Sequence, residues 1–310
     1  MSFRKAFLFL LFFTSYFREG FATHIVGGEI FYQCIGGNNY LITLKVYRDC
    51  LNGEAPFDDP ATISVYNSSG AWLQDLQVSL PGSTPVPPII NNPCLQYPPN
   101  ICVEEAVYIA EANLPPISGG YHLAYQRCCR NGTILNLSDP GNAGSTYYCY
   151  IPDQSVVTCN SSPSFNNFPP IVLCAGDALN FDHSATDPDG DVLLYELCEP
   201  YTGASDTDPM PVPAAGPPYQ FVGWNNPYSG SYPLASSPVL SIGANTGLLT
   251  GTPNTVGQFV VAVCVSEYRN GVLLIGGNKA GSGDKTFYDQ LIHQSEKIYF
   301  RYLEGKNNEK

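Results

Sequence analysis

The 310-residue chain carries a net charge of −13, and only 13% of its residues are Asp, Glu, Lys or Arg, against a usual ~25%. Such an acidic chain repels phosphate backbones, which argues against nucleic acid as a partner. Gly (29), Pro (27) and Tyr (21) are abundant, a mix that favours short strands joined by tight turns over a helix-rich cytosolic enzyme. The acidic body either attracts cations such as calcium or simply keeps the protein soluble.

The first 22 residues have the pattern of a secretory signal peptide. Arg4 and Lys5 precede the apolar run FLFLLFF, and Gly20 and Ala22 stand at positions −3 and −1 of a cleavage before Thr23. The run is shorter than the ~20 residues that span a bilayer, and no later stretch is long enough. We therefore predict an exported protein, secreted or at the cell surface, with no transmembrane segment in the mature chain.

Residues 23–160 are predicted to form a cysteine-rich β domain. Residues 40–47 (YLITLKVY) alternate, with Tyr40, Ile42, Leu44 and Val46 on the face expected to be buried. Residues 28–34 are the expected hairpin partner, across a turn at 36–39. Further strands are expected at 61–66, 103–110, 121–128 and 146–151, and a proline-rich loop at 81–99.

Residues 161–170 (SSPSFNNFPP) lack periodicity and are interpreted as a linker. The following strands are expected at 171–173, 178–181, 192–197, 219–224, 239–242 and 258–267, then a hairpin through Asn270-Gly271 to 272–275. This regular spacing predicts a second β-sandwich over 171–276. Residues 277–310 are interpreted as a tail, either helical or disordered. The predicted fold class is all-β, with two disulfide-bonded, β-sandwich-like domains of Ig or cadherin type.

Eleven cysteines in an exported chain predict disulfides. Zinc is disfavoured, because the chain has no C-x-x-C pair and no histidine at ligand spacing. Cys94 and Cys102 are expected to tie down the proline-rich loop. Cys128 and Cys129 would point to opposite faces of a strand and so bond different partners. The sequence does not choose among the other pairings, and the odd cysteine is either free or paired between chains.

The most specific local motif is Asp187-Pro188-Asp189-Gly190-Asp191. Three carboxylates at i, i+2 and i+4 can surround one hard cation, and calcium takes 6–8 oxygens. The plain alternative is a type I turn with Pro188 at i+1 and Gly190 at i+3. The motif is not an EF-hand, because its glycine is misplaced and its twelfth position is Cys198. Asp187, Asp189 and Asp191 are the candidate calcium ligands, with Asp177 and Asp182 as weaker ones.

Several sequence patterns resemble parts of catalytic sites. Residues 25–28 (IVGG) resemble the mature N-terminus of trypsin-like proteases, but none of His24, His122, His183 and His293 has a catalytic context. Gly27 and Gly28 are expected to serve a bulge in the first strand. The adjacent carboxylates of Asp58 and Asp59 point apart, which disfavours glycosidase-type cooperation. We predict that the protein is not an enzyme, and a secreted hydrolase is the less favoured alternative.

Aromatic side chains offer another function. Trp72, Trp224, Tyr228 and Tyr232 would stack on sugars if they were exposed, although such residues in β domains more often pack in the core. A secreted glycan-binding module is therefore the main alternative.

Two blocks resemble known families. Residues 23–69 (THIVGGEIFYQCIGGNNYLITLKVYRDC and following) resemble the opening domain of very large secreted or surface proteins of gliding Bacteroidota, which carry PKD or Ig-like repeats and a gliding-motility-type sorting domain. Residues 165–270, with ATDPDGDVLLYEL and NTGLLTGTPNTVGQFVVAV, resemble a cadherin-like or Ig-like module. After Gly276 the resemblance stops, and no sorting domain or further repeat follows, which leaves the mode of surface anchoring open. The resemblance implies adhesion or scaffolding at the cell surface, with calcium as the only expected cofactor and a surface, matrix or glycan component as the partner.

Overall fold

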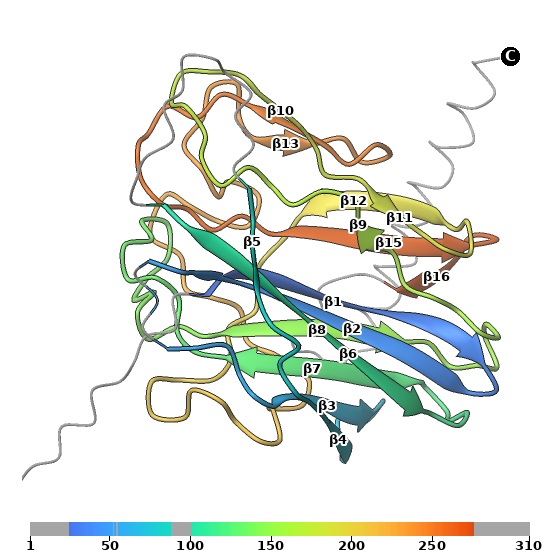
Figure 1. Cartoon of the computed structure of the whole chain (residues 1–310). Coiled ribbons are helices and arrows are strands. Elements are labelled where there is room, and N and C mark those ends of the chain that lie inside the picture. The colour runs from blue at the N-terminus through green and yellow to red at the C-terminus, as the bar shows by residue number, and fades with distance from the viewer. Residues whose placement is uncertain (1–24, 52, 54, 88–100, 276–310) are drawn as a thin grey trace, which may run out of the picture.

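The computed structural model describes residues 25–51, 53, 55–87 and 101–275. Their regular structure is entirely antiparallel β, without a helix, as the composition predicts. A two-sheet sandwich fills the first half, and three smaller sheets of the second half lie along one side of it (Figure 1). The predicted signal peptide, 1–22, and the predicted tail, 277–310, lie outside the described residues.

The first sheet of the sandwich is built on the predicted hairpin. Its order is β1 (Ile25–Gly36), β2 (Asn39–Asp49), β6 (Val103–Asn113) and β5 (Thr84–Pro85). The prediction for β2 is confirmed, because Tyr40, Ile42, Leu44 and Val46 are each 1% exposed or less. The turn before β2 places Gly36, Gly37 and Asn38 at positive φ, which glycine and asparagine adopt at low cost.

The second sheet closes the core. Its order is β4 (Trp72–Val78), β3 (Ala61–Asn67), β7 (Tyr121–Arg127) and β8 (Ser145–Ile151). All seven residues of β7 are buried, which a strand reaches only when both faces are covered. Leu123 and Tyr125 point into the sandwich core, while Ala124 packs on the other side against Ala214 and Tyr219 from the second half.

The second half contains short sheets around a small core. One sheet has the order β10 (Leu179–Asp182), β14 (Leu248–Gly251) and β13 (Ser241–Ile242). A second pairs β9 (Ser164–Phe165) with β11 (Ala185–Thr186). The third has the order β12 (Val192–Leu197), β15 (Val263–Arg269) and β16 (Val272–Ile275). The core consists of Leu179, Phe181, Leu234, Leu240 and Leu249, with Leu197 of β12 packed against it. It is far smaller than the core of the first sandwich.

Two predicted strands of the second half are wrong. Residues 171–173 form no strand. Residues 219–224 make only single bridges, Tyr201 with Phe221 and Leu137 with Trp224. The reason is that Tyr219 and Phe221 stack in an aromatic cluster on the first sandwich instead of joining a ladder. In contrast, the Asn270-Gly271 hairpin between β15 and β16 is confirmed, with both turn residues at positive φ.

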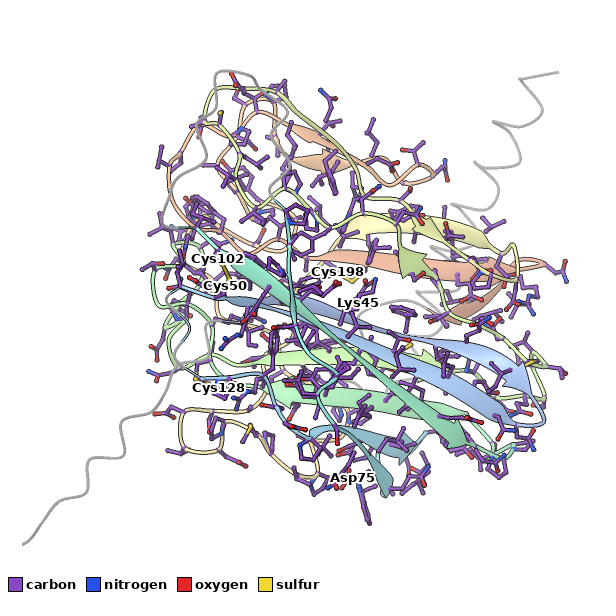
Figure 2. The ribbon with its side chains drawn as sticks, in the orientation of Figure 1. Lys45, Cys50, Asp75, Cys102, Cys128 and Cys198 are labelled. Atoms are coloured by element: carbon purple, nitrogen blue, oxygen red, sulfur yellow. A yellow bond between two sulfur atoms is a disulfide. The ribbon has the colours of Figure 1, made fainter. Side chains whose placement is uncertain are left out.

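Four disulfides are present among the described residues: Cys34–Cys159, Cys50–Cys102, Cys128–Cys129 and Cys198–Cys264. Cys50 and Cys102 lie side by side at one end of the first sandwich (Figure 2). The expectation that Cys128 and Cys129 bond different partners is wrong, because β7 ends at Arg127 and the two cysteines leave the strand geometry on which it rested. Cys149 and Cys174 form no disulfide with another described residue, and Cys94 lies outside the described residues.

The segment predicted as a linker packs tightly on the first sandwich. The Ser162 N–H donates to the Tyr32 carbonyl at 2.9 Å, and residues 164–165 form β9. The Phe168 ring lies 4.2 Å from that of Tyr47, on the outer face of β2. The division into domains 23–160 and 171–276 stays a prediction, but the described halves share a continuous packed contact. No helix within the described ranges is long and apolar enough to cross a membrane.

Gly28 offers a test of the sandwich packing. A Cβ at Gly28 would stand 2.7 Å from the Lys45 carbonyl oxygen and 2.8 Å from the Tyr147 ring, whereas a Cβ at Gly27 would meet nothing within 4 Å. We expect Gly28→Ala to lower the free energy of unfolding by about 1–3 kcal/mol through overpacking. Gly27→Ala, one residue away, is the matched control and should leave it nearly unchanged. Chemical denaturation of both variants measures the difference, and equal stabilities would contradict this packing.

Candidate functional site

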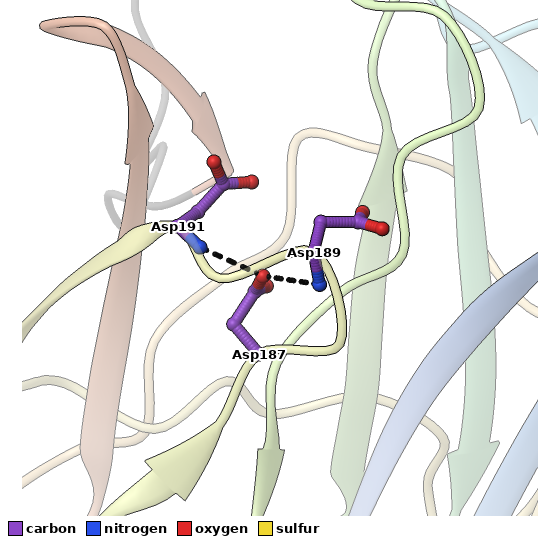
Figure 3. A group of neighbouring side chains, drawn as sticks. All are labelled: Asp187, Asp189 and Asp191. Carbon is purple, nitrogen blue, oxygen red and sulfur yellow. Dashed lines mark hydrogen bonds between the residues drawn. The ribbon is translucent and has the colours of Figure 1, made fainter.

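The DPDGD motif forms a tight turn between β11 and β12. The carboxylate Oδ1 of Asp187 accepts hydrogen bonds from the N–H groups of Asp189 at 2.9 Å and Asp191 at 3.0 Å (Figure 3). The Gly190 N–H donates to the Asp187 carbonyl, and Gly190 has a φ of 79°. Asp187 therefore builds the turn, because its side chain replaces the backbone partners that a loop lacks. The predicted turn is confirmed.

The turn gathers the three predicted carboxylates. One oxygen each from Asp187, Asp189 and Asp191 lies within 4.8 Å of the others, a spacing that suits oxygen coordination of one hard cation. Asp177 and Asp182 do not join this group. Asp177 lies beside Cys174, and the Asp182 carboxylate accepts a hydrogen bond from the Ser184 N–H at 3.0 Å. We call Asp187, Asp189 and Asp191 the carboxylate turn.

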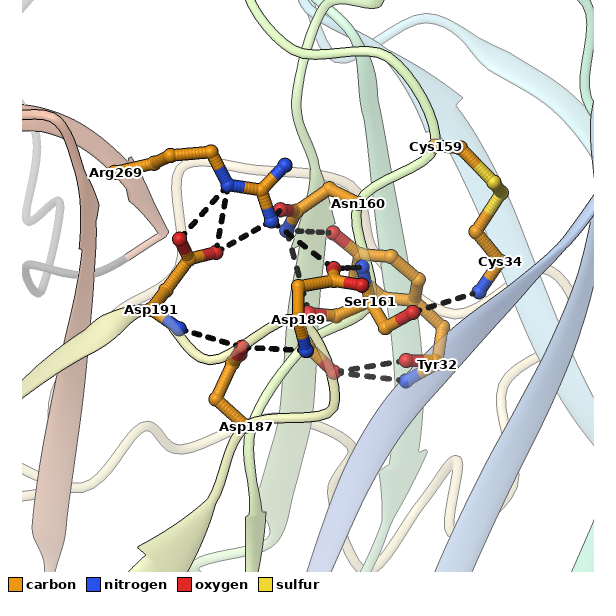
Figure 4. A network of polar contacts seen from close by, with 10 residues as sticks. Tyr32, Cys34, Cys159, Asn160, Ser161, Asp187, Asp189, Asp191 and Arg269 are labelled. Carbon is orange, nitrogen blue, oxygen red and sulfur yellow. Dashed lines mark hydrogen bonds and ion pairs between the residues drawn. A yellow bond between two sulfur atoms is a disulfide. The ribbon is translucent and has the colours of Figure 1, made fainter.

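A positive side chain already faces the carboxylate turn. The Arg269 Nε donates to both oxygens of Asp191, at 2.8 and 3.0 Å, and its Nη2 lies 3.1 Å from Asp189 Oδ2 (Figure 4). These bonds raise the pKa of Arg269. Burial raises the pKa of Asp191, but the hydrogen bond and charge of Arg269 together with the neighbouring Glu267 side chain outweigh that effect, and the pKa is lowered. Arg269 thus supplies part of the charge that a metal ion would otherwise supply.

The carboxylate turn also joins the second half to the first. Asp189 Oδ2 accepts the Ser161 N–H at 2.7 Å. The Asn160 Oδ1 accepts from Arg269 at 2.8 Å, and its Nδ2 donates to the Tyr32 hydroxyl on β1 at 3.2 Å. The Cys34–Cys159 disulfide ties the preceding residue to the same strand (Figure 4). The turn therefore sits where the chain crosses from the first sandwich into the second half.

Glu267 of β15 adds a fourth acid beneath this turn. Its side chain is fully buried, and neither carboxyl oxygen has a donor in ordinary hydrogen-bond geometry. Burial first, and then the neighbouring Asp191, raise the pKa of Glu267 to about 9. The group is therefore a neutral acid at pH 7. Ionising it beside Asp191 would place two negative charges next to each other in a buried setting, which is costly.

One oxygen in the carboxylate turn is left without a partner. Asp187 Oδ2 is buried and makes no hydrogen bond to the described residues. Burial raises the pKa of Asp187, and the nearby carboxylates of Asp191 and Asp189 add to the rise, while the two backbone N–H donors oppose it. A buried carboxylate oxygen without a hydrogen-bond partner is stabilised when it binds either a proton or a cation.

The motif alone did not show three partners of the turn: Asn160, Glu267 and Arg269. A signal for two of them was present, since Glu267 and Arg269 share one face of the strand with the apolar Val263 and Val265. A charged residue at such a position is rarely buried unless paired. Nothing in the local sequence indicates that Asn160, over 100 residues earlier, completes the network.

The other candidate residues separate into unrelated settings. Asp58 faces Arg127 at 3.0 Å and the Tyr125 hydroxyl at 2.8 Å, while Asp59 accepts the Leu80 N–H at 3.0 Å. The two carboxylates therefore do point to different partners.

The aromatic candidates also differ in exposure. Trp72 on β4 is 51% exposed, whereas the Trp224 indole N–H donates to Glu199, and Tyr228 stacks near Tyr232 with centroids 6.3 Å apart. Of the histidines, the buried His122 contacts the Tyr148 hydroxyl at 2.7 Å, and His183 stacks on Phe165. Trp72 is the most exposed of the four aromatic candidates.

A comparison of the chain with protein-family models, curated proteins and solved structures finds no match. Functional inference therefore depends on the chain's own geometry.

Glu267 makes stability depend on pH in a defined direction. Its pKa is about 9 folded and 4.5 unfolded, so the folded state binds more protons between those values, and this group's contribution is lost as pH rises through that window. We expect Glu267→Gln, which stays neutral, to raise the free energy of unfolding at pH 8 by about 1–3 kcal/mol and to flatten its decline between pH 6 and pH 9. Urea unfolding at several pH values measures both effects.

Glu111→Gln is the control, since Glu111 lies exposed on β6. A Glu267→Gln variant that keeps the wild-type pH dependence would show that Glu267 is ionised in the folded protein.

Proposed function

We propose that the protein is an exported, non-catalytic adhesion or scaffolding module that calcium stiffens at the carboxylate turn. The observation that carries the proposal is the meeting of three carboxylates, within 4.8 Å of one another, at the crossing between the two halves. A cation held there would fix the relative position of the halves, which is what a load-bearing module needs.

The covalent frame supports this role. Disulfides join residues 125, 52 and 66 positions apart in the chain, and such crosslinks persist in oxidising compartments outside the cytoplasm. Each typically contributes about 2–4 kcal/mol by restricting the unfolded chain. Together with the signal-like N-terminus, they favour a secreted or cell-surface location. A frame of this kind suits an extracellular binding surface.

Calcium and Arg269 would compete for the carboxylate turn. The guanidinium contacts Asp191 and Asp189, whereas the buried Asp187 Oδ2 has no partner. Calcium would bind to Asp187 and Asp189 and draw Asp191 away from Arg269. A divalent ion displaces one guanidinium from several carboxylate oxygens only when those oxygens converge, as they do in the carboxylate turn. The affinity is accordingly expected at the weak end of extracellular sites, with a Kd of roughly 10⁻⁴–10⁻³ M.

A thermal melt of the full chain tests calcium binding. At a Kd of about 10⁻⁴ M, about 5 mM calcium would stabilise the folded state by about 2 kcal/mol relative to chelator. Asp189→Asn should abolish this gain, because it removes one charge from the carboxylate turn. Magnesium at the same concentration is the control for ionic strength, and it should act less because it demands a stricter geometry.

The Arg269→Gln variant distinguishes the contribution of the Arg269 guanidinium from that of calcium at the carboxylate turn. Without calcium the variant should lose about 1–2 kcal/mol, because three carboxylates keep no countercharge. With calcium it should gain more than wild type, since the competitor is gone. If neither wild type nor Arg269→Gln responds to calcium, the turn is held by Arg269 alone and calcium has no part in the function.

A glycan-binding module is the second candidate, favoured by the half-exposed Trp72 ring on the edge strand β4. The Trp72 indole N–H donates to Asp75 Oδ1 at 3.1 Å, which holds the ring in place on the surface. Exposed, fixed aromatic rings are suited to stacking on sugar faces.

A glycan array distinguishes the two functions. Glycan binding that Trp72→Ala abolishes and Trp224→Ala leaves intact would favour the second candidate, because the Trp224 indole is engaged with Glu199 inside the fold. Binding to cells or matrix that resists Trp72→Ala but needs calcium would favour adhesion through another surface.

A further inference from the structure

A cleft of about 1700 Å³ runs between the first sandwich and the second half. We refer to the part of it that is lined by β1, β8 and the segment after β7 as one end of the cleft. The residues that line this end include Ile25, Gly27, Gly28, Arg130, Ser145 and Tyr147. It is separate from the carboxylate turn, and its chemistry is the opposite, because it presents donors instead of acceptors.

Arg130 is a buried cation that has no carboxylate partner among the described residues. Arg130 is only 7% exposed. The Nε donates to the Gly144 carbonyl at 3.2 Å and the Nη2 to the Tyr201 carbonyl at 3.1 Å, while the Nη1 makes no hydrogen bond with the described residues. Each of the other Lys and Arg residues in the described ranges has a carboxylate within 4.0 Å; Arg130 has none there.

Two unused hydroxyls stand beside this guanidinium. Ser145 and Tyr147 are two apart on β8 and so share one face of the strand. Both hydroxyl oxygens are buried and make no hydrogen bond of ordinary geometry to the described residues. Thr146, on the opposite face, is fully engaged with Gln126 and the Thr202 carbonyl. Buried hydroxyls are normally paired, so two unpaired ones next to an unpaired cation indicate a missing acceptor.

The surroundings hold these donors in a fixed position. The Tyr147 ring lies against Gly28 of β1, where a Cβ would come within 2.8 Å of it, and it stacks near Tyr125. Burial raises the pKa of Tyr147, and the Arg130 charge and the Ser145 hydroxyl both oppose the rise. Such a preformed set of donors needs little ordering when a ligand binds.

We propose that this end of the cleft binds a carboxylate group, with Arg130 as its counter-ion and the hydroxyls of Tyr147 and Ser145 as additional donors. A carboxylate is an acceptor-only group whose two oxygens match the guanidinium fork. One positive charge in the pocket suits a monovalent anion, since a divalent one would leave a buried negative charge uncompensated. The carboxylate comes either from a free carboxylic acid or from the acidic sugar of a glycan. The inference does not depend on calcium at the carboxylate turn.

Calorimetric titration of the full chain at constant ionic strength tests the pocket and its source of carboxylate. The probes are sodium acetate, sodium glucuronate, glucose and sodium sulfate. Saturable binding of both acetate and glucuronate assigns the site to the carboxylate itself, and binding of glucuronate alone assigns it to an acidic sugar. If neither carboxylate binds, with or without sulfate binding, or if glucose binds as well as glucuronate, the proposal is overturned.

Tyr147→Phe is the most informative variant. Its hydroxyl makes no hydrogen bond of ordinary geometry with the described residues, so its removal should leave the thermal midpoint unchanged or raise it. It should weaken carboxylate binding roughly tenfold, because a hydrogen bond to a charged acceptor is lost. Arg48→Gln is the matched control, since Arg48 is engaged with Glu104 outside the cleft and should not alter affinity. Wild-type affinity in Tyr147→Phe would remove this hydroxyl from the site and overturn the donor set.

Discussion

Charge at the end of β15 controls how the two halves of this protein meet. Glu267 and Arg269 project from the same face of the strand, toward acids that belong to the turn before β12. Arg269 helps to lower the pKa of Asp191 against the effect of burial, whereas burial first, and then Asp191, raise the pKa of Glu267. Had β15 shifted by one residue, both side chains would face away, and the acids would be left without their cation.

The same face of β15 is also connected to the first sandwich by hydrogen bonds. Through Asn160 the network reaches the Tyr32 hydroxyl, and burial first, with Cys149 and Glu267 among the further causes, raises the pKa of Tyr32 well above its ordinary value. A buried neutral phenol, a buried neutral acid and an ion pair thus share one continuous set of contacts. Removing one member of this set would leave a buried polar neighbour without its partner, so the members depend on one another.

Much of the first sandwich follows from local sequence, and much of the second half does not. The alternation of residues 40–47 fixes both the strand and its buried face, because a period of two has only one way to hide four apolar side chains. The strand β4 was not predicted, since WLQDLQV mixes polar and apolar residues on both faces of an edge strand. Residues 219–224 have strand-like composition, yet their rings pack on β7, and burial against a distant surface outweighs β-propensity.

The candidate site shows the same division between local and distant information. The carboxylates of Asp187, Asp189 and Asp191 converge because one side chain nucleates the turn that contains the other two, so the sequence predicts that part. The partners Asn160, Ser161 and Arg269 come from segments whose proximity depends on the whole chain tracing. The vicinal Cys128–Cys129 bridge was likewise not predicted, because strand geometry was assumed to continue past Arg127.

Two arginines show how the chain distributes its scarce positive charge. Arg269 is only partly buried and is surrounded by carboxylates, so its cost of desolvation is offset within the protein. Arg130 is more deeply buried, and within the described part of the chain it is held by carbonyl oxygens, which carry partial charge and do not neutralise it. The chain has a net charge of −13, so it contains many acidic residues that could serve as a counter-ion to Arg130. A cation kept at the end of a cleft with two unused hydroxyls is therefore better explained by an acceptor that arrives from solution than by a structural role alone.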